Sequence, residues 1–283
     1  MRGRRIGDGA VARRMILGFV LVLSLLVLVA PIAVILVHAF SAGIPTFLSE
    51  LARPDTVKAM QLTVIVALIV VPVNTVFGLV AAWALGKFRF PGRRFLIALM
   101  EVPFSVSPVV AGVAYLFVYG ARGLFGEFLS DHDIKIMFAL PGIVLASLFV
   151  TAPLVAREVL SLMESQGNDT EEAALSLGAS GLTTFFRVTL PNIRWALIFG
   201  VVLCNARVMG EFGAVSVVSG NIRGETNTLP LQIELLYHDY NAVGAFAAAS
   251  VLTGLALVTL VVKYLIDRAG KAAGVELSAR TGH

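Results

Sequence analysis

The sequence predicts an all-α integral membrane protein with six transmembrane helices. The chain of 283 residues is 58% hydrophobic and 14% charged, whereas a soluble domain is about 45–50% apolar and about 25% charged. Its mean hydropathy is +0.88. Its apolar residues also gather in stretches near the roughly 20 residues that cross a bilayer core. There are six such stretches: 15–39, 61–85, 95–119, 136–155, 195–218 and 242–266.

The first stretch follows a basic leader. Its apolar run is longer than the roughly 7–15 residues of a secretory signal, so we expect it to be retained as a helix. We therefore divide the chain into a basic tail over 1–14, a six-helix membrane domain over 15–266 and a second tail over 267–283.

The lysines and arginines predict the orientation of these helices, because cytoplasmic loops carry an excess of both residues. Sixteen of the 22 lie in the two tails and in the second and fourth connections, five lie on the other side, and Arg207 lies within a span. Both termini are therefore expected in the cytoplasm. The third stretch holds Glu101, Pro103 and Pro108 close together, which predicts a broken helix lining a cavity.

The longest cytoplasmic connection, over 156–194, is predicted to form two short amphipathic helices. Asp169 can cap the first, with Glu172 three residues later as a capping box requires. Gly178 is placed to end that helix. Ser180 can cap the second helix, and Pro191 is expected to close it.

Small and apolar side chains on this connection suit docking into a groove on a partner. The alternative is a helix that lies in the lipid headgroup region. From the physics of the residues alone, both interpretations stay open.

A resemblance bears on that choice. Glu172-Ala173-Ala174, three residues, Gly178, nine residues and Val188-Thr189-Leu190-Pro191 resemble the EAA loop of ABC-importer permeases, which reads EAA-x3-G-x9-I-x-L-P. Only Val188 departs from that pattern. The resemblance implies the type I ABC importer permease fold and a coupling helix that docks on a separate ATPase. The coupling residues it implies are Glu171, Glu172, Ala173, Ala174, Leu177, Gly178 and Pro191.

Catalysis on this chain is not expected. The sequence holds no G-x-x-x-x-G-K-[ST] phosphate loop and no serine nucleophile elbow. Its four histidines are scattered and its one cysteine, Cys204, lies in an apolar run, so no metal cluster or internal disulfide is predicted. We expect no cofactor on this chain, with ATP and Mg bound by the partner ATPase.

The fifth stretch carries two opposite charges. Arg207 and Glu211 are four residues apart and can pair, and charged groups inside a membrane normally face the bundle interior or a water-filled path. They are either a packing ion pair or part of the translocation path or gate. Gly210 and Gly213 would allow a close backbone approach or a hinge. Asn205 and Ser216 can either contact an oxyanion or join helices.

The same stretch carries a narrower resemblance. Ala206-Arg-Val-Met-Gly-Glu-Phe-Gly-Ala214 is similar to the A-R-x-x-G-E-[FY]-G segment of sulfate and molybdate permeases. The stretches 102–112, 187–196, 215–226 and 229–235 are similar to CysW-type permeases of sulfate/thiosulfate importers. This resemblance runs from about Leu51 to Asp267.

That likeness implies an assembly in a bacterial inner membrane. The implied partners are a CysT-like second permease, a CysA-like ATPase dimer and a periplasmic sulfate- or thiosulfate-binding protein, with membrane lipid and no nucleic acid. A molybdate or tungstate permease is the alternative. A secondary transporter or membrane enzyme is a remote one, since no internal repeat or catalytic cluster is seen.

Overall fold

The computed structural model describes residues 10–272, and every regular element among them is a helix. Within this part, five helices are long and apolar enough to cross a membrane, or six if one bent pair counts as a span. The all-helical class is thus confirmed. Of the predicted tails over 1–14 and 267–283, residues 1–9 and 273–283 lie outside the described residues.

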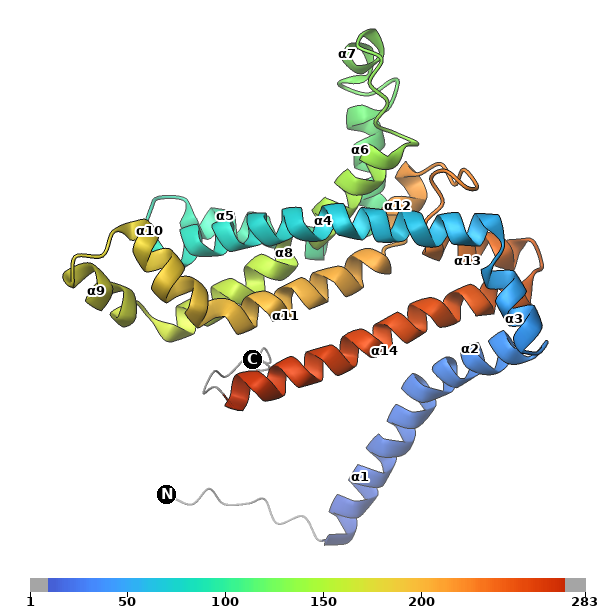
Figure 1. The fold of residues 1–283 in the computed structure, drawn as a ribbon, viewed down its shortest axis with the longest axis horizontal. Helices are drawn as coiled ribbons and strands as arrows, with labels where there is room; N and C mark the ends of the chain where they lie inside the picture. Colours follow the sequence, from blue (N-terminus) through green and yellow to red (C-terminus); the bar gives the residue numbers. More distant parts are fainter. Residues whose placement is uncertain (1–9, 273–283) are drawn as a thin grey trace.

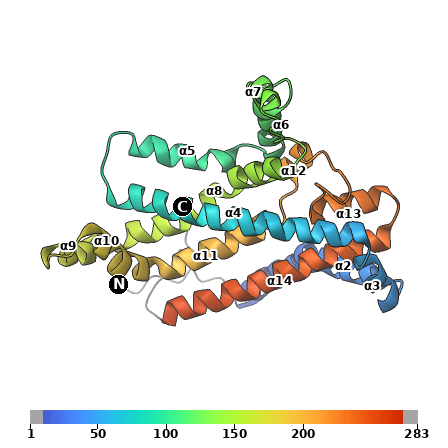
Figure 2. The same ribbon diagram turned by 45° about the horizontal axis from the view of Figure 1, so that its top comes forward.

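Four long helices form the bundle: α4 (Pro54–Lys87), α8 (Leu140–Gln166), α11 (Leu190–Met209) and α14 (Ala242–Ala272). They run roughly along the long axis of the molecule (Figure 1). Helix α4 packs most extensively on α8, and α11 lies against α4, α8 and α14. The short helices α9 (Asp169–Ser176) and α10 (Gly181–Thr184) form one end of the bundle, and α3 (Ile44–Leu51) and α13 (Leu229–His238) gather at the other, as both views show (Figures 1 and 2).

A polar cluster fastens the middle of the bundle. The Asn74 amide of α4 donates hydrogen bonds to Thr151 Oγ1 at 2.7 Å and to the Leu148 carbonyl at 3.3 Å, both on α8. Cys204 of α11 packs beside the same amide. A Cβ atom on Gly78 would lie 2.8 Å from the Ala156 backbone nitrogen, so the two helices touch almost backbone to backbone. Such contacts hold helices together where lipid supplies no hydrophobic drive.

The third predicted span is broken, as its prolines indicated. It consists of α5 (Arg93–Ser105) and α6 (Pro108–Tyr119), which are bent by 105°. Helix α6 and the short α7 (Gly126–Asp131) project sideways from the bundle (Figure 1). The bend lies at Ser107–Pro108, where proline starts a new helix because it has no N–H to continue the old one.

Two helices end elsewhere than the spans predicted for them. The helix of the fourth predicted span does not end at Val155, because α8 continues to Gln166 with Val159, Leu160 and Met163 buried. The connection predicted over 156–194 therefore leaves its helix only at Gly167. The fifth span ends at Met209 instead of continuing to Val218, and α12 (Gly213–Val218) is a separate helix.

Both π-helical turns precede a proline. The turn η1 (Leu25–Val29) joins α1 (Ala10–Ser24) to α2 (Ala30–Phe40), and η2 (Phe185–Thr189) joins α10 to α11. In each, the residue before the proline donates its N–H five residues back, from Ala30 to Leu25 and from Leu190 to Phe185. The wider turn gives the proline ring room beside the preceding carbonyl. Pro191 was predicted to close a helix, but the helix runs on through it.

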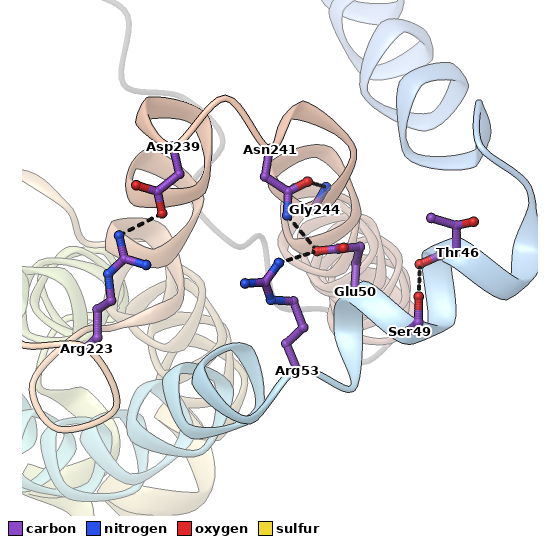
Figure 3. A network of polar contacts seen from close by, with 8 residues as sticks. All are labelled: Thr46, Ser49, Glu50, Arg53, Arg223, Asp239, Asn241 and Gly244. Atoms are coloured by element: carbon purple, nitrogen blue, oxygen red, sulfur yellow. Dashed lines mark hydrogen bonds and ion pairs between the residues drawn. The ribbon is translucent and has the colours of Figure 1, made fainter.

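The first helix stands apart from the bundle: α1 slants away in Figure 1, whereas α2 packs on α14. A polar network fastens the opposite end of this segment (Figure 3). Glu50 Oε2 of α3 accepts hydrogen bonds from Asn241 at 2.7 Å and from Arg53 at 3.3 Å. The Asn241 side chain in turn accepts from the Gly244 N–H in the first turn of α14. Helix α3 is thereby fixed to the start of the last span.

Candidate functional site

Helix α9 carries the centre of the predicted coupling loop. Its predicted capping box is wrong, because Asn168 is the N-cap and makes no side-chain capping bond. Asp169 is instead the first helical residue, so three acidic side chains lie in the first turn, where the helix dipole favours them. The predicted end at Gly178 is confirmed. Gly178 has a φ of +87° and its N–H bonds to the Leu175 carbonyl, while the Ala179 N–H reaches back to Ala174, as in a Schellman motif.

Helix α10 follows after a short turn. The predicted Ser180 cap is confirmed, since its hydroxyl accepts from the Thr183 N–H at 3.3 Å. Pro191 follows the π-helical turn η2, lies in the first turn of α11 and is exposed. Helix α10 is therefore the beginning of a continuous helical rod over 181–209, and α9 precedes this rod.

Glu171 and Glu172 point in different directions. Glu171 turns inward, where its Oε1 lies 2.9 Å from Lys87 Nζ at the end of α4 and accepts from Thr189 Oγ1 at 3.2 Å. Burial raises the pKa of Glu171, but the hydrogen bond and charge of Lys87 outweigh this and hold its pKa below the ordinary value. Glu172 is exposed. Of these two glutamates, only Glu172 therefore points outward.

Three large apolar side chains are exposed at this end, and we call them the apolar face. Leu177 is 89% exposed, and Leu182 and Phe186, which follow it in α10 and η2, are exposed too. Ala173 is exposed and Ala174 half-buried. Behind this face is a cavity of about 320 Å³ between α9, η2 and the end of α4, lined in part by Trp83, Glu172 and Phe185. A face of this kind can receive a partner surface.

The second group of predicted residues lies where two helices break. The break between α11 and α12 packs on the break between α5 and α6, because a Cβ on Gly213 would lie 2.9 Å from Pro108 Cβ. A Cβ on Gly112 would likewise lie 2.8 Å from the Ala214 carbonyl oxygen. The close approach predicted at Gly213 is confirmed. At Gly210 no close approach is found, since a Cβ there would meet only the Ala206 carbonyl oxygen at 3.5 Å. Gly210 instead lies at the end of α11, where the helix breaks, which agrees with the alternative prediction of a bend.

Arg207 and Glu211 form the predicted ion pair, with Nη2 and Oε2 3.2 Å apart. The pair is asymmetric: the Glu211 side chain is 1% exposed and that of Arg207 is 49% exposed. The other carboxylate oxygen of Glu211 accepts the Ala214 N–H at 3.1 Å and so caps α12. The approach of Arg207 to Oε2 lacks hydrogen-bond geometry. Most donors of this guanidinium therefore have no acceptor within the described residues.

The remaining predicted residues show no convergence on one point. Ser216 donates its hydroxyl to the Gly213 carbonyl at 2.9 Å within α12, and Asn205 is half-buried on α11. The coupling-loop residues and the residues at the helix breaks are also in different parts of the bundle, at its end and further along it (Figure 1). They are two separate candidate sites.

The model of the family "Binding-protein-dependent transport system inner membrane component" matches residues 74–271. This range holds both candidate sites and most of the chain. The chain belongs to this family. It is accordingly the inner-membrane permease component of a transport system, with several membrane-spanning helices, and the family assignment made from the EAA spacing is confirmed.

Individual relatives narrow the comparison. The chain is 55% identical over 252 residues to the sulfate transport system permease protein CysW of Escherichia coli, covering 89% of this chain and 87% of that protein. It is 36% identical over 255 residues to the sulfate transport system permease protein CysT of Salmonella typhimurium, covering 88% and 92%. A crystal structure of a bacterial alginate ABC transporter contains a chain that matches with a TM-score of 0.73 at 17% identity, over 93% and 94% of the two chains. That likeness shows the fold.

The sequence reasoning missed several residues of this permease component. Lys87 and Thr189 hold Glu171, yet they come from separate segments. A periodic pattern cannot reveal such a contact. Leu182 and Phe186 of the apolar face were detectable, since both lie in the predicted second short helix. Their four-residue spacing places them on one face.

Proposed function

We propose that this chain is a permease subunit of an ATP-driven sulfate/thiosulfate importer and couples to its ATPase through α9 and α10. The exposed apolar face of Leu177, Leu182 and Phe186 at the end of the bundle carries the coupling part of the proposal. A monomeric protein would gain nothing from such a face in water, whereas a docked ATPase would cover it. Sulfate is proposed because the relatives above are sulfate permeases; they lend no support to molybdate or tungstate.

The proposed assembly follows from the same relatives. Two permease chains, this one and a CysT-like partner, would share the translocation path. A CysA-like ATPase dimer would bind ATP and Mg and dock on both coupling helices, and a periplasmic sulfate- or thiosulfate-binding protein would deliver the anion. In this scheme Arg207 faces the path and attracts the dianion, while Glu211 limits how tightly it is held.

The first experiment asks for partners and substrate together. The chain is purified in detergent from cells that express its whole importer, the copurifying proteins are identified, and the complex is tested for uptake of radiolabelled sulfate with molybdate as competitor. We expect an ATPase and a second permease, and uptake that unlabelled sulfate suppresses and molybdate does not. Absence of an ATPase, or competition by molybdate at equal concentration, would contradict the proposal.

Glu172→Lys tests the docking face itself. The substitution reverses a charge at the start of α9, worth about 0.3–1 kcal/mol there, and places a cation on the proposed contact. Substrate-stimulated ATP turnover should fall, and Glu172→Gln should fall less because it removes the charge without reversing it. Equal turnover in all three proteins would exclude Glu172 from the docking face.

We further propose six spans, with the bent pair α5–α6 counted as the third, and both termini in the cytoplasm. The native Cys204 is fully buried, so a single introduced cysteine reports its own side of the membrane. Tyr240→Cys, at a position that is 97% exposed, should react with an impermeant thiol reagent in intact cells. Arg89→Cys, at an exposed position in the connection after α4 and outside the docking face, should react only after permeabilisation. The reverse pattern would overturn the orientation.

A further inference from the structure

Helix α9 has few packing contacts of its own. It contacts mainly α10 and η2, and glycines with positive φ, Gly167 at +73° and Gly178 at +87°, flank it on both sides. Its outward residues are exposed. A helix held only in this way would absorb a push from the ATPase by swinging about its flanking turns, so an additional connection to the bundle matters for coupling.

We propose that Lys87 is the positioning residue that ties the coupling helix to α4, so that displacement of α9 moves α4. This inference rests on the proposed coupling function. Lys87 is the last residue of α4. Its ammonium lies 2.9 Å from Glu171 Oε1 and donates to the Gly167 carbonyl at 2.8 Å and to Asn168 Oδ1 at 3.1 Å.

The ammonium of Lys87 thus makes one ion pair and two hydrogen bonds. They fall on the residue before α9, on its N-cap and within its first turn, so the beginning of the helix is held at three points. The side chains of Lys87 and Glu171 are only 11% and 13% exposed. The pair is therefore shielded from the screening that makes exposed ion pairs weak.

The other end of α4 explains why this helix is a suitable recipient. Helix α4 is continuous over 34 residues. At its far end Thr63 Oγ1 accepts the Leu229 N–H at 2.8 Å, which fixes the start of α13. Midway, Asn74 joins α4 to α8. A displacement received at Lys87 can thus pass along one continuous helix, which contains Pro72, to identified contacts at Asn74 and Thr63.

The test measures sulfate imported per ATP hydrolysed by the complete complex in proteoliposomes. For Lys87→Met we expect normal recovery of the ATPase with the complex. The ratio of sulfate imported to ATP hydrolysed should fall by about fivefold or more, which corresponds to a modest coupling free energy. Glu171→Gln, which is isosteric and keeps hydrogen-bond acceptors, should lower the ratio less. The double variant Lys87→Glu with Glu171→Lys should recover part of it, because the charge pair is restored while the bonds to Gly167 and Asn168 are not.

The matched control is Arg93→Met. Arg93 forms an even shorter ion pair at the same end, with Nη2 2.6 Å from Glu164 Oε1, but that pair joins α5 to α8 and does not touch α9. Its loss should leave the ratio unchanged. An unchanged ratio in Lys87→Met, or an equal fall in Arg93→Met, would overturn the inference. If the wild-type complex lacks the ATPase or imports no sulfate, the proposed function itself fails.

Discussion

Two ion pairs, Lys87–Glu171 and Arg207–Glu211, lie at the two candidate sites and differ in how exposed the cation is. This difference distinguishes a pair that holds helices together from one that can bind another anion. Lys87 and Glu171 are both mostly buried, and the ammonium also donates two hydrogen bonds to residues at the start of α9. Glu211 is buried, but Arg207 is half-exposed and its one contact is the ion pair. A buried pair with further hydrogen bonds holds elements together. A cation whose counter-ion is tied to a helix N-terminus retains donors for another anion.

The largest effect should come from Glu211→Ala, which removes the buried member of the Arg207–Glu211 pair. It removes the acceptor of the Ala214 N–H and the counter-ion of Arg207, and we expect a loss of about 2–4 kcal/mol in stability. The check is the yield and thermal midpoint of the detergent-purified complex. Glu211→Gln keeps an acceptor for α12 and should lose about half as much. Equal loss in the two variants would show that the charge, and not the cap, stabilises this region.

The next effect concerns the contact between the two helix breaks that positions this pair. Gly213→Val would put a side chain where even a Cβ lies 2.9 Å from Pro108 Cβ, and overpacking of this kind costs about 1–3 kcal/mol. The matched control is Gly210→Ala, at a position with a φ of −96° and room for a Cβ. It should change the stability of the complex by no more than about 0.5 kcal/mol, and the thermal midpoint should shift correspondingly little. If both variants destabilise alike, the breaks do not depend on close contact.

Arg207→Ala tests the exposed half of the pair. Because the side chain is 49% exposed, we expect normal recovery of the complex. Sulfate uptake should fall at least about tenfold, as the loss of one charge-assisted contact of about 1.5–3 kcal/mol implies. Arg207→Lys should retain part of the activity, since it keeps the charge with fewer donors. Uptake at the wild-type rate in Arg207→Ala would return Arg207 to the alternative, a pair that only stabilises packing.

The sequence predicted the helices and the family well because both depend on local patterns. Apolar length located the long helices, and the spacing from Glu172 to Pro191 identified the family. The boundary at Val155 was misplaced because the next turns of α8 carry Arg157 and Glu164 among apolar residues, a pattern that resembles a loop leaving the membrane. The buried face of those turns depends on α4, which lies elsewhere in the sequence.

Proline gave another instructive error. Pro108 begins a new helix after a break, as predicted, whereas Pro191 is accommodated by the π-helical turn before it. Composition alone does not separate the two cases, because the outcome depends on whether the preceding turn can widen. Likewise the inward direction of Glu171 follows from a lysine at the end of α4. Neighbouring acids in one helix turn look equivalent until the partner that selects between them is placed.

The smallest effect is expected at the coupling end, where Gly178 acts through the backbone alone. Its φ is +87° and a Cβ there would meet nothing within 4 Å, so a substitution strains the conformation without any clash. A β-branched residue in this region costs about 1–2 kcal/mol. Gly178→Val should therefore unwind the end of α9 and reduce the ATPase retained by the complex in a salt wash by about fivefold or more. Gly178→Asn should be close to wild type, since asparagine tolerates this conformation. If valine and asparagine behave alike, the left-handed turn is not what presents Leu177 to the ATPase, and the docking face must be held by the contacts of α10 and Lys87 instead.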